Sequence, residues 1–321
     1  CRHRDPQCHE ASMSDSGLIA DLRLIAGDAA VRCDDEALAF ASSDVHETGP
    51  RPATVVRPGN AGQTAQCIAA ATRRGYAIAP RGGGLSYTAG FIPPNSRTVT
   101  IDTRGLNRIT ALSPEDMTIT VEAGVTWKQI NDALKPRGLR LPFFGTFSGK
   151  GATVGGGLSH GALFFGSARY GSAAEIVLGL EIACADGSLL RTGQGALKKQ
   201  SKPFLRSFGP DLTGLFVHDG GALGVKTAAS FRLIADPPIE EFASFSFEKF
   251  EAASRALCRI AREELVEEVY ILDPASTGHL DLDMADKLRS ARSVAKAARG
   301  PITAIRSLIE MSAAGTHFIP E

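Results

Sequence analysis

The sequence predicts an α+β protein in which short strands and helices alternate and glycine-rich loops lie beside the strands. Residues 51–80 read as strand, helix and strand, and residues 175–193 read as a hairpin. Glycine gathers in three segments, 79–90, 149–193 and 208–234. Because a loop without side chains exposes main-chain N–H groups and permits close approach, we expect the three segments to bind one long ligand between them.

The first third of the chain predicts a helix, a strand and a second helix, in that order. Residues 16–27 carry Leu and Ile at helical spacing, and residues 51–58 form a short apolar run closed by proline. The alanine-rich run 60–75 predicts a second helix. Asn60 is its expected N-cap and Gly75 its expected end.

The middle of the chain predicts mostly strands. The short apolar strand 76–80 runs directly into "APRGGGLSYTAG", residues 79–90. Residues 96–138 read as strand, turn, strand and helix. Thr126 with Gln129 three residues later predicts a capping box for that helix, and Gly138 predicts its end. The Asp-Gly pair inside "EIVLGLEIACADGSLLRTG", residues 175–193, predicts the turn of a hairpin.

Composition excludes two classes of partner. Lysine plus arginine number 35 and aspartate plus glutamate number 35, so no bulk charge draws the chain toward nucleic acid or a membrane surface. No stretch approaches the ~18 apolar residues of a membrane helix, and the N-terminus lacks the apolar part of a signal peptide. The sequence therefore predicts a cytoplasmic protein without an integral membrane segment.

The six cysteines predict neither disulfides nor a metal site. They are scattered along 321 residues, without the spacing of a disulfide framework. Cys1, His3, Cys8 and His9 lie close together in a polar leader, but no second ligand pair follows at a finger-like spacing. We expect reduced thiols and no metal.

Two familiar phosphate motifs are excluded by spacing. A G-x-G-x-x-G fingerprint that begins at Gly82 would need glycine where Tyr87 stands, and one that begins at Gly155 would need glycine at His160. "SGKGAT", residues 148–153, has Gly151 in place of the Ser or Thr of a Walker loop. Neither dinucleotide fold of the Rossmann type nor P-loop chemistry is indicated.

Four motifs in order carry a resemblance to a known family. "PRGGGLSYTAG", "ATVGGGLSHGA", "SARYGSAAEIVLGLEIACADGSLLRTG" and "GPDLTGLFVHDGGALGVKT" span about residues 50–235. This order resembles the flavin-binding domain of the p-cresol methylhydroxylase and vanillyl-alcohol oxidase superfamily, in particular its D-lactate dehydrogenase and glycolate oxidase D-subunit branch. The resemblance implies two α/β subdomains with FAD between them, followed by a substrate-binding cap domain.

The resemblance also implies cofactor contacts at matching positions. Pro80 to Ser86 would surround the pyrophosphate, with Arg81 at the entrance of the loop. The segment around Tyr170 and Gly171 would support the side of the site that holds the ribityl chain and the flavin. Main-chain N–H groups of glycine loops can approach a dianionic pyrophosphate closely and donate hydrogen bonds to it. The implied cofactor-binding residues are Pro80, Arg81, Gly82, Gly83, Gly84, Leu85 and Ser86 at the pyrophosphate, Thr153, Val154, Gly155, Gly156, Ser159, His160, Gly161 and Ala162 along the ribityl and flavin side, and Leu223, Gly224 and Val225 at the adenine end.

Three positions depart from the family pattern. Relatives that attach flavin covalently through the first loop have histidine where this chain has Leu85, so we expect noncovalent FAD. An Asn-Ala-Gly-Gly-like run is replaced by residues 161–164, and a frequent glutamate is replaced by Gly220. At these two places the details of the family's flavin contacts are not carried over to this chain.

The domain organisation predicted from the resemblance has three parts. Residues 1–14 form a disordered polar leader, residues 15–235 the FAD-binding domain, and residues 236–321 the start of an incomplete α/β cap. The cap begins with "DPPIEEFASFSFEKFEAASRALCRIAREEL", which reads as a strand and a helix. No histidine-rich counterpart of the family's metal motif occurs in residues 236–321, so the chain resembles a fragment.

No residue is assigned as the catalytic base. His160 is a weak candidate that either faces the flavin or is satisfied by the backbone, and His218 beside Asp219 either orients the cofactor or lies on a surface turn. Asp44 and His46 either reach the site or stay solvated. Tyr87 either contacts the flavin or packs at the loop end.

The expected function is an FAD-dependent oxidoreductase that oxidises a 2-hydroxy acid, such as D-lactate or glycolate, or a related alcohol. Hydride would pass to the flavin while a base removes the hydroxyl proton. The alternatives are an FAD-binding module without independent turnover and a glycine-rich structural domain without cofactor. The partner is a small-molecule substrate, and the electron acceptor is left open.

Overall fold

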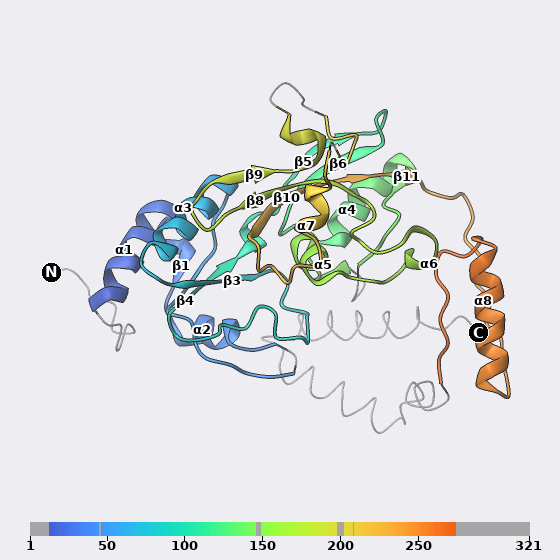
Figure 1. Cartoon of the computed structure of the whole chain (residues 1–321), viewed down its shortest axis with the longest axis horizontal. Coiled ribbons are helices and arrows are strands. Elements are labelled where there is room, and N and C mark those ends of the chain that lie inside the picture. Colours follow the sequence, from blue (N-terminus) through green and yellow to red (C-terminus); the bar gives the residue numbers. More distant parts are fainter. Residues whose placement is uncertain (1–12, 45, 146–148, 198–201, 208, 274–321) are drawn as a thin grey trace, which may run out of the picture. The chain divides into compact units, whose positions relative to one another are not determined.

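The computed structural model describes residues 13–44, 46–145, 149–197, 202–207 and 209–273 (Figure 1). It contains a four-stranded and a five-stranded sheet, each with helices and a hydrophobic core of its own. The predicted α+β class with two subdomains is therefore confirmed.

The helices have these bounds in chain order: α1 Met13–Ala26, α2 Asp35–Ala41, α3 Ala61–Thr72, α4 Trp127–Leu134, α5 Val154–His160, α6 Ser167–Tyr170, α7 Leu212–Leu215 and α8 Phe250–Arg262. The strands are β1 Val31–Arg32, β2 Thr54–Val56, β3 Ala77–Arg81, β4 Thr98–Asp102, β5 Ile109–Ser113, β6 Thr118–Glu122, β7 Leu139–Arg140, β8 Val177–Ala183, β9 Leu189–Arg191, β10 Val225–Arg232 and β11 Ile234–Ala235.

The four-stranded sheet has the order β1-β2-β4-β3, and β2 and β3 both run parallel to β4. The predicted helix between β2 and β3 is α3, and it begins as the sequence indicates, because the Asn60 side chain accepts a hydrogen bond from the Gln63 N–H at 2.9 Å. The chain leaves this helix through Gly75, whose φ of 73° favours glycine. Strand β3 is an edge strand, so the loop that follows it lies at the rim of the sheet.

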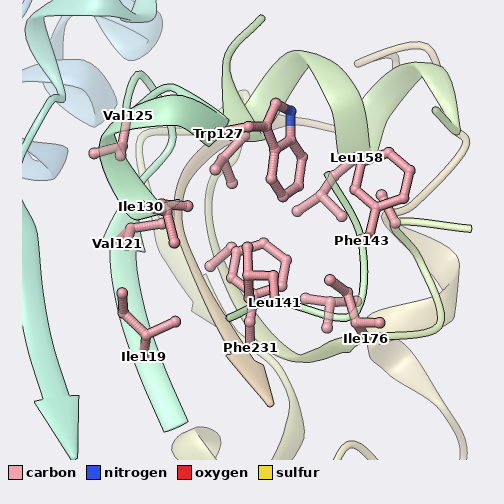
Figure 2. Packing of buried hydrophobic residues seen from close by; sticks show 14 of the residues in the cluster. Ile119, Val121, Val125, Trp127, Ile130, Leu141, Phe143, Leu158, Ile176 and Phe231 are labelled. Atoms are coloured by element: carbon pink, nitrogen blue, oxygen red, sulfur yellow. The ribbon is translucent and has the colours of Figure 1, made fainter. Parts of the chain in front are cut away.

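The five-stranded sheet has the order β5-β6-β10-β8-β9 and is antiparallel throughout. The predicted hairpin is the β8–β9 pair. One face of the sheet packs against α4 and α5 around Trp127, whose ring lies 5.1 Å from that of Phe143 and 5.8 Å from that of Phe231 (Figure 2). A Cβ at Gly157 would lie 2.8 Å from the indole, so the large side chain in the core requires a glycine in α5.

The two subdomains are joined through α3. Its residues Ala65 and Ile68 belong to the same core cluster as Ala183 of β8 and Val225 of β10. The Thr72 hydroxyl also donates to the Ala185 carbonyl at 2.6 Å. The ends of β3 and β10, and the glycine segments beside them, are thereby held in a fixed relation.

The capping box of α4 is formed as predicted, and removing it is expected to destabilise the protein. Thr126 Oγ1 accepts from the Gln129 N–H, and Gln129 Oε1 accepts from the Thr126 N–H at 2.8 Å. Thr126→Ala should lower the free energy of unfolding by about 1 kcal/mol, because it leaves helix N–H groups without an acceptor. Chemical denaturation measures this change. Thr126→Ser keeps the hydroxyl and should recover most of the loss; equal destabilisation by both substitutions would contradict the capping role.

The region after β10 differs in part from the prediction. Strand β11 pairs with β7, and α8 is the predicted helix. The predicted cap strand before α8 does not form among the described residues: 236–249 contain no paired strand, and Phe242 and Phe245 are 80% and 72% exposed. A strand needs a neighbour for its main-chain hydrogen bonds, and this segment has none in the described part of the chain.

The chain divides into two compact units, one of Cys1–Glu248 with Cys258–Val269 and one of Lys249–Leu257 with Tyr270–Glu321. The predicted boundary at residue 235 remains a prediction. The leader with Cys1, His3, Cys8 and His9 lies outside the described residues, except that α1 begins at Met13. None of the described helices has the length and apolar composition needed to cross a bilayer.

Candidate functional site

The first glycine segment continues directly from the end of β3. Among the described residues, none accepts a hydrogen bond from the N–H groups of residues 82–86. Gly84 has a φ of 68°, a conformation that favours glycine. Residues 82–86 are half-buried, so their N–H groups lie at the surface of the fold. A row of preorganised, unused N–H groups suits an anion.

The second glycine segment lies directly against the first. A Cβ at Gly83 would overlap the carbonyl oxygen of Gly151, and a Cβ at Gly82 would overlap the hydroxyl of Thr153. The Leu85 side chain lies beside Gly151, 3.1 Å from the position of a Cβ there. The backbones of the two segments therefore touch because both lack side chains at the contact.

The N-terminal end of α5 does not offer its first amides to a ligand. The Val154 N–H donates to the Val125 carbonyl at 2.9 Å, and the Gly155 N–H donates to the Ala123 carbonyl at 2.8 Å. Thr153 caps the helix by accepting from the Gly156 N–H. These residues fix α5 against the five-stranded sheet, so any contact of Val154 or Gly155 with a cofactor would be one of packing.

The third glycine segment meets the other two. The His218 N–H donates to the Leu158 carbonyl and the Gly220 N–H to the Ser159 carbonyl, each at 2.9 Å. A Cβ at Gly221 would lie 2.9 Å from the ring of Pro80. All three glycine segments therefore converge, as the sequence predicted. Gly220 has a φ of 61°, which favours glycine at this position.

The remaining predicted cofactor residues lie at the ends of α5 and β10. Gly161 ends α5 with a φ of 72°, and a Cβ there would lie 2.8 Å from the His218 ring. Ala162 follows and donates its N–H to the Gly157 carbonyl. At the start of β10, Leu223 is 51% exposed while Val225 is buried.

A buried ion pair fastens the turn at residues 219–221 to the start of β10. Lys226 Nζ lies 2.6 Å from Asp219 Oδ1, and both side chains are 2% exposed. The same carboxylate oxygen accepts the Gly221 N–H at 3.0 Å. Burial lowers the pKa of Lys226, and the hydrogen bond to Asp219 opposes that effect. Sequence reasoning missed Lys226, although an isolated lysine at the start of an apolar strand is a signal for a buried partner.

Arginines gather beneath the first loop. Arg57 and Arg104 both contact the buried carboxylate of Asp102, at 2.7 and 2.8 Å. Burial raises the pKa of Asp102, but the hydrogen bonds from the two arginines outweigh burial and leave the pKa below its usual value. Burial lowers the pKa of the nearby Arg81 to about 10, with a further lowering by Arg104. Arg57 and Arg104 thus share Asp102, and Arg81 lies within the field of Asp102 and Asp44, so three positive charges stand against two negative ones.

The candidate acid–base residues are placed as follows. His160 is exposed, and its ring lies 6.4 Å from that of Tyr87, which is 65% exposed. His218 is exposed as well, with a φ of 58°. His46 is exposed, whereas Asp44 accepts the N–H groups of His46, Glu47 and Ala89, and these bonds lower its pKa.

Tyr170 is tied to the last part of the first unit. Its hydroxyl donates to Glu267 Oε1 at 3.3 Å, and Arg140 forms an ion pair with the same carboxylate. The Ala168 N–H donates to the Glu267 carbonyl at 3.2 Å. Helix α6 is therefore held from one side by residue 267, a contact that the sequence did not indicate. No group of three His, Cys, Asp or Glu side chains within the described ranges could hold a metal ion.

Comparison with family models gives one match. The model described as an FAD binding domain matches residues 52–193, a range that contains the first two glycine segments and the hairpin.

Curated relatives resemble the chain over about two thirds of its length. It is 28% identical to the mitochondrial D-lactate dehydrogenase [cytochrome] 1 of Saccharomyces cerevisiae over 66% of this chain and 35% of that protein. It is 28% identical to the glycolate oxidase subunit GlcD of Bacillus subtilis over 67% of this chain and 44% of that protein. A probable mitochondrial D-lactate dehydrogenase of Danio rerio is 32% identical over 60% of this chain and 39% of that protein. The chain spans less than half the length of these relatives.

Solved structures share the fold. An alkyldihydroxyacetonephosphate synthase superposes with a TM-score of 0.67 at 20% identity, covering 82% of this chain and 51% of that one. A p-cresol methylhydroxylase with substrate bound superposes with a TM-score of 0.63 at 22% identity, covering 73% and 46%. The likeness confirms the fold that the resemblance implied.

Proposed function

We propose that the chain is the flavin-binding part of an oxidoreductase that oxidises a 2-hydroxy acid. The premise is that residues 52–193 form an FAD-binding domain of the p-cresol methylhydroxylase type. The observation that carries this proposal is the convergence of three glycine segments around free main-chain N–H groups. FAD is the cofactor of the domain. The identity of the substrate and the activity of the whole protein are proposed.

The residues present fit an FAD molecule. A pyrophosphate carries negative charge, which free N–H groups and a local excess of arginine both stabilise. Residues 82–86 have N–H groups without an acceptor among the described residues and lie beside Arg81, whereas the amides of Val154 and Gly155 are already used. We therefore assign the pyrophosphate to the first loop, and the flavin side to residues 153–156 and 159–162 through packing. Leu223, Gly224 and Val225 would cover the adenine end.

The attachment of FAD is proposed to be noncovalent. Leu85 has no nucleophilic atom, and its side chain packs against Gly151. When bound, FAD supplies the hydride acceptor, and the protein supplies placement and electrostatics. Residues 82–86 would bind and orient the nucleotide. His160 beside Tyr87 remains the weak candidate for moving the substrate hydroxyl proton.

The substrate class rests on the named relatives. Two are D-lactate dehydrogenases and one is a subunit of glycolate oxidase, and D-lactate and glycolate are both 2-hydroxy acids. A second candidate is an FAD-binding module without independent turnover. The electron acceptor is left open, and the cytoplasmic location and the lack of a nucleic-acid partner remain predictions.

Anaerobic reduction of the FAD-loaded protein tests the proposal. D-lactate, glycolate and D-2-hydroxyglutarate are mixed in turn with the protein, and loss of the visible flavin absorbance is followed. Bleaching by at least one of them is expected. Retention of colour with all three, in protein that dithionite still bleaches, would favour the module without turnover. Acid precipitation should release all the flavin into the supernatant; flavin that stays with the pellet would contradict noncovalent attachment.

A further inference from the structure

The side chain of Arg81 is directed into the protein, behind the first glycine loop. The residue is 4% exposed, and its guanidinium carbon lies 4.2 Å from the centre of the Phe40 ring and 4.3 Å from that of Phe91. A guanidinium between two aromatic faces is held by cation–π attraction on both sides. With a pKa of about 10, it remains charged at neutral pH.

The same guanidinium lies directly beneath Gly84. Its Nη2 atom is 2.5 Å from the position that a Cβ at Gly84 would take, and its Nη1 atom donates to the Ser43 carbonyl at 2.9 Å. Its Nε atom is buried and has no partner among the described residues. The contacts of Arg81 therefore hold a buried positive charge against the loop whose N–H groups at residues 82–86 have no acceptor among the described residues.

The segment that contains Phe40 and Ser43 also fixes the far end of the loop. Asp44 Oδ2 accepts the Ala89 N–H at 3.0 Å, and Ala89 has a φ of 57°, which is uncommon for a residue other than glycine. The Ala89 carbonyl in turn accepts the Ile92 N–H at 3.0 Å. Residues 40–44 thus hold residues 81–92 at two places: Arg81 contacts Phe40 and Ser43 at the start of the loop, and Asp44 accepts the Ala89 N–H near its end.

We infer that Arg81 is a positioning residue: stacked between Phe40 and Phe91, it holds the glycine loop in its binding conformation and places a buried positive charge behind the pyrophosphate. This inference rests on the proposed function for the nature of the ligand. In this role Arg81 does not contact the ligand directly. Its guanidinium acts by holding the backbone of residues 82–84 and through the electric field of its charge.

Calorimetric binding of FAD, ADP and riboflavin to Arg81→Met tests the inference. The Kd for FAD and for ADP should rise about tenfold or more, which corresponds to about 1.4 kcal/mol, while the Kd for riboflavin, which has no phosphate, should stay unchanged. Wild-type affinity for FAD, or an equal loss for FAD and riboflavin, would overturn it. Arg97→Met is the matched control. Like Arg81, Arg97 stacks on an aromatic ring, here Tyr76, and donates a hydrogen bond to a carbonyl, here that of Arg74. It lies at the opposite end of the sheet from the glycine loop.

A second readout does not depend on flavin. Amide hydrogen exchange at Ala89 and Ile92 in the free protein should become faster in Arg81→Met and stay unchanged in Arg97→Met; unchanged exchange in both would overturn the positioning role. If Arg81→Met does not fold, Phe40→Leu takes its place, since Phe40 is 47% exposed and its loss keeps the charge. A wild-type protein that binds neither FAD nor ADP would contradict the proposed function, whereas the exchange result still decides the role of Arg81.

Discussion

Gly83→Ala is expected to raise the Kd for FAD by about a hundredfold or more, a loss of about 2.7 kcal/mol of binding free energy. The added Cβ would overlap the carbonyl oxygen of Gly151, and all three atoms nearest to it belong to the backbone of Gly151 and Ala152. A backbone cannot turn aside as a flexible side chain can, so the first and second glycine segments must separate. The N–H groups of residues 82–86 then lose their common orientation. Titration of the protein with FAD, followed by flavin fluorescence, measures the change.

Gly90→Ala is the matched control for this prediction. It lies in the same loop and is exposed, and its Cβ would meet only Thr88 Oγ1, at 3.8 Å, an ordinary contact. FAD affinity should stay within a factor of about two of the wild type, or about 0.4 kcal/mol. Equal effects of the two substitutions would show that contact between the glycine segments does not govern binding.

Lys226→Met is expected to lower the free energy of unfolding by about 3–5 kcal/mol. The substitution leaves the Asp219 carboxylate buried without its counter-ion, while Asp219 Oδ2 already has no partner among the described residues. An unpaired buried charge costs more than the pair contributes, so Asp219→Leu combined with Lys226→Met should recover most of the loss. Guanidinium denaturation of the two variants gives the comparison.

An exposed ion pair gives the matching control. Lys128 and Asp132 lie one helical turn apart in α4, 2.7 Å from each other, with side chains 44% and 57% exposed. Lys128→Met should cost less than about 1 kcal/mol, because solvent screens this pair. Similar losses for Lys128→Met and Lys226→Met would mean that burial of the Asp219 pair is not what makes it strong.

Local signals in the sequence predicted much of the fold. The Asn60 cap, the Thr126–Gln129 capping box and the Asp-Gly hairpin turn each depend on residues within a few positions of one another, and each forms as expected. The order of the glycine motifs added the resemblance to a family of flavin-binding domains, and with it the expectation of two subdomains. Local chemistry therefore specified the caps and turns, and the ordered motifs indicated which loops would come together.

Long-range placement was beyond the sequence. Nothing in residues 51–80 indicates that β4 inserts between β2 and β3, because strand order is set by contacts across the whole sheet. Arg81 reads as a ligand contact until Phe40 and Phe91 are seen on either side of it. The cap strand expected before α8 lacks a partner strand in the described residues, and alternating Phe and Ser cannot form a strand alone.

The central claim is that the three converging glycine segments make one site for a flavin nucleotide. Calorimetric titration of the purified protein with FAD, repeated with ADP present as competitor, tests it most directly. We expect saturation at one FAD per chain and an apparent affinity that falls as ADP is added, since both ligands share the pyrophosphate. Absence of heat and of bound flavin after incubation with excess FAD would contradict the claim.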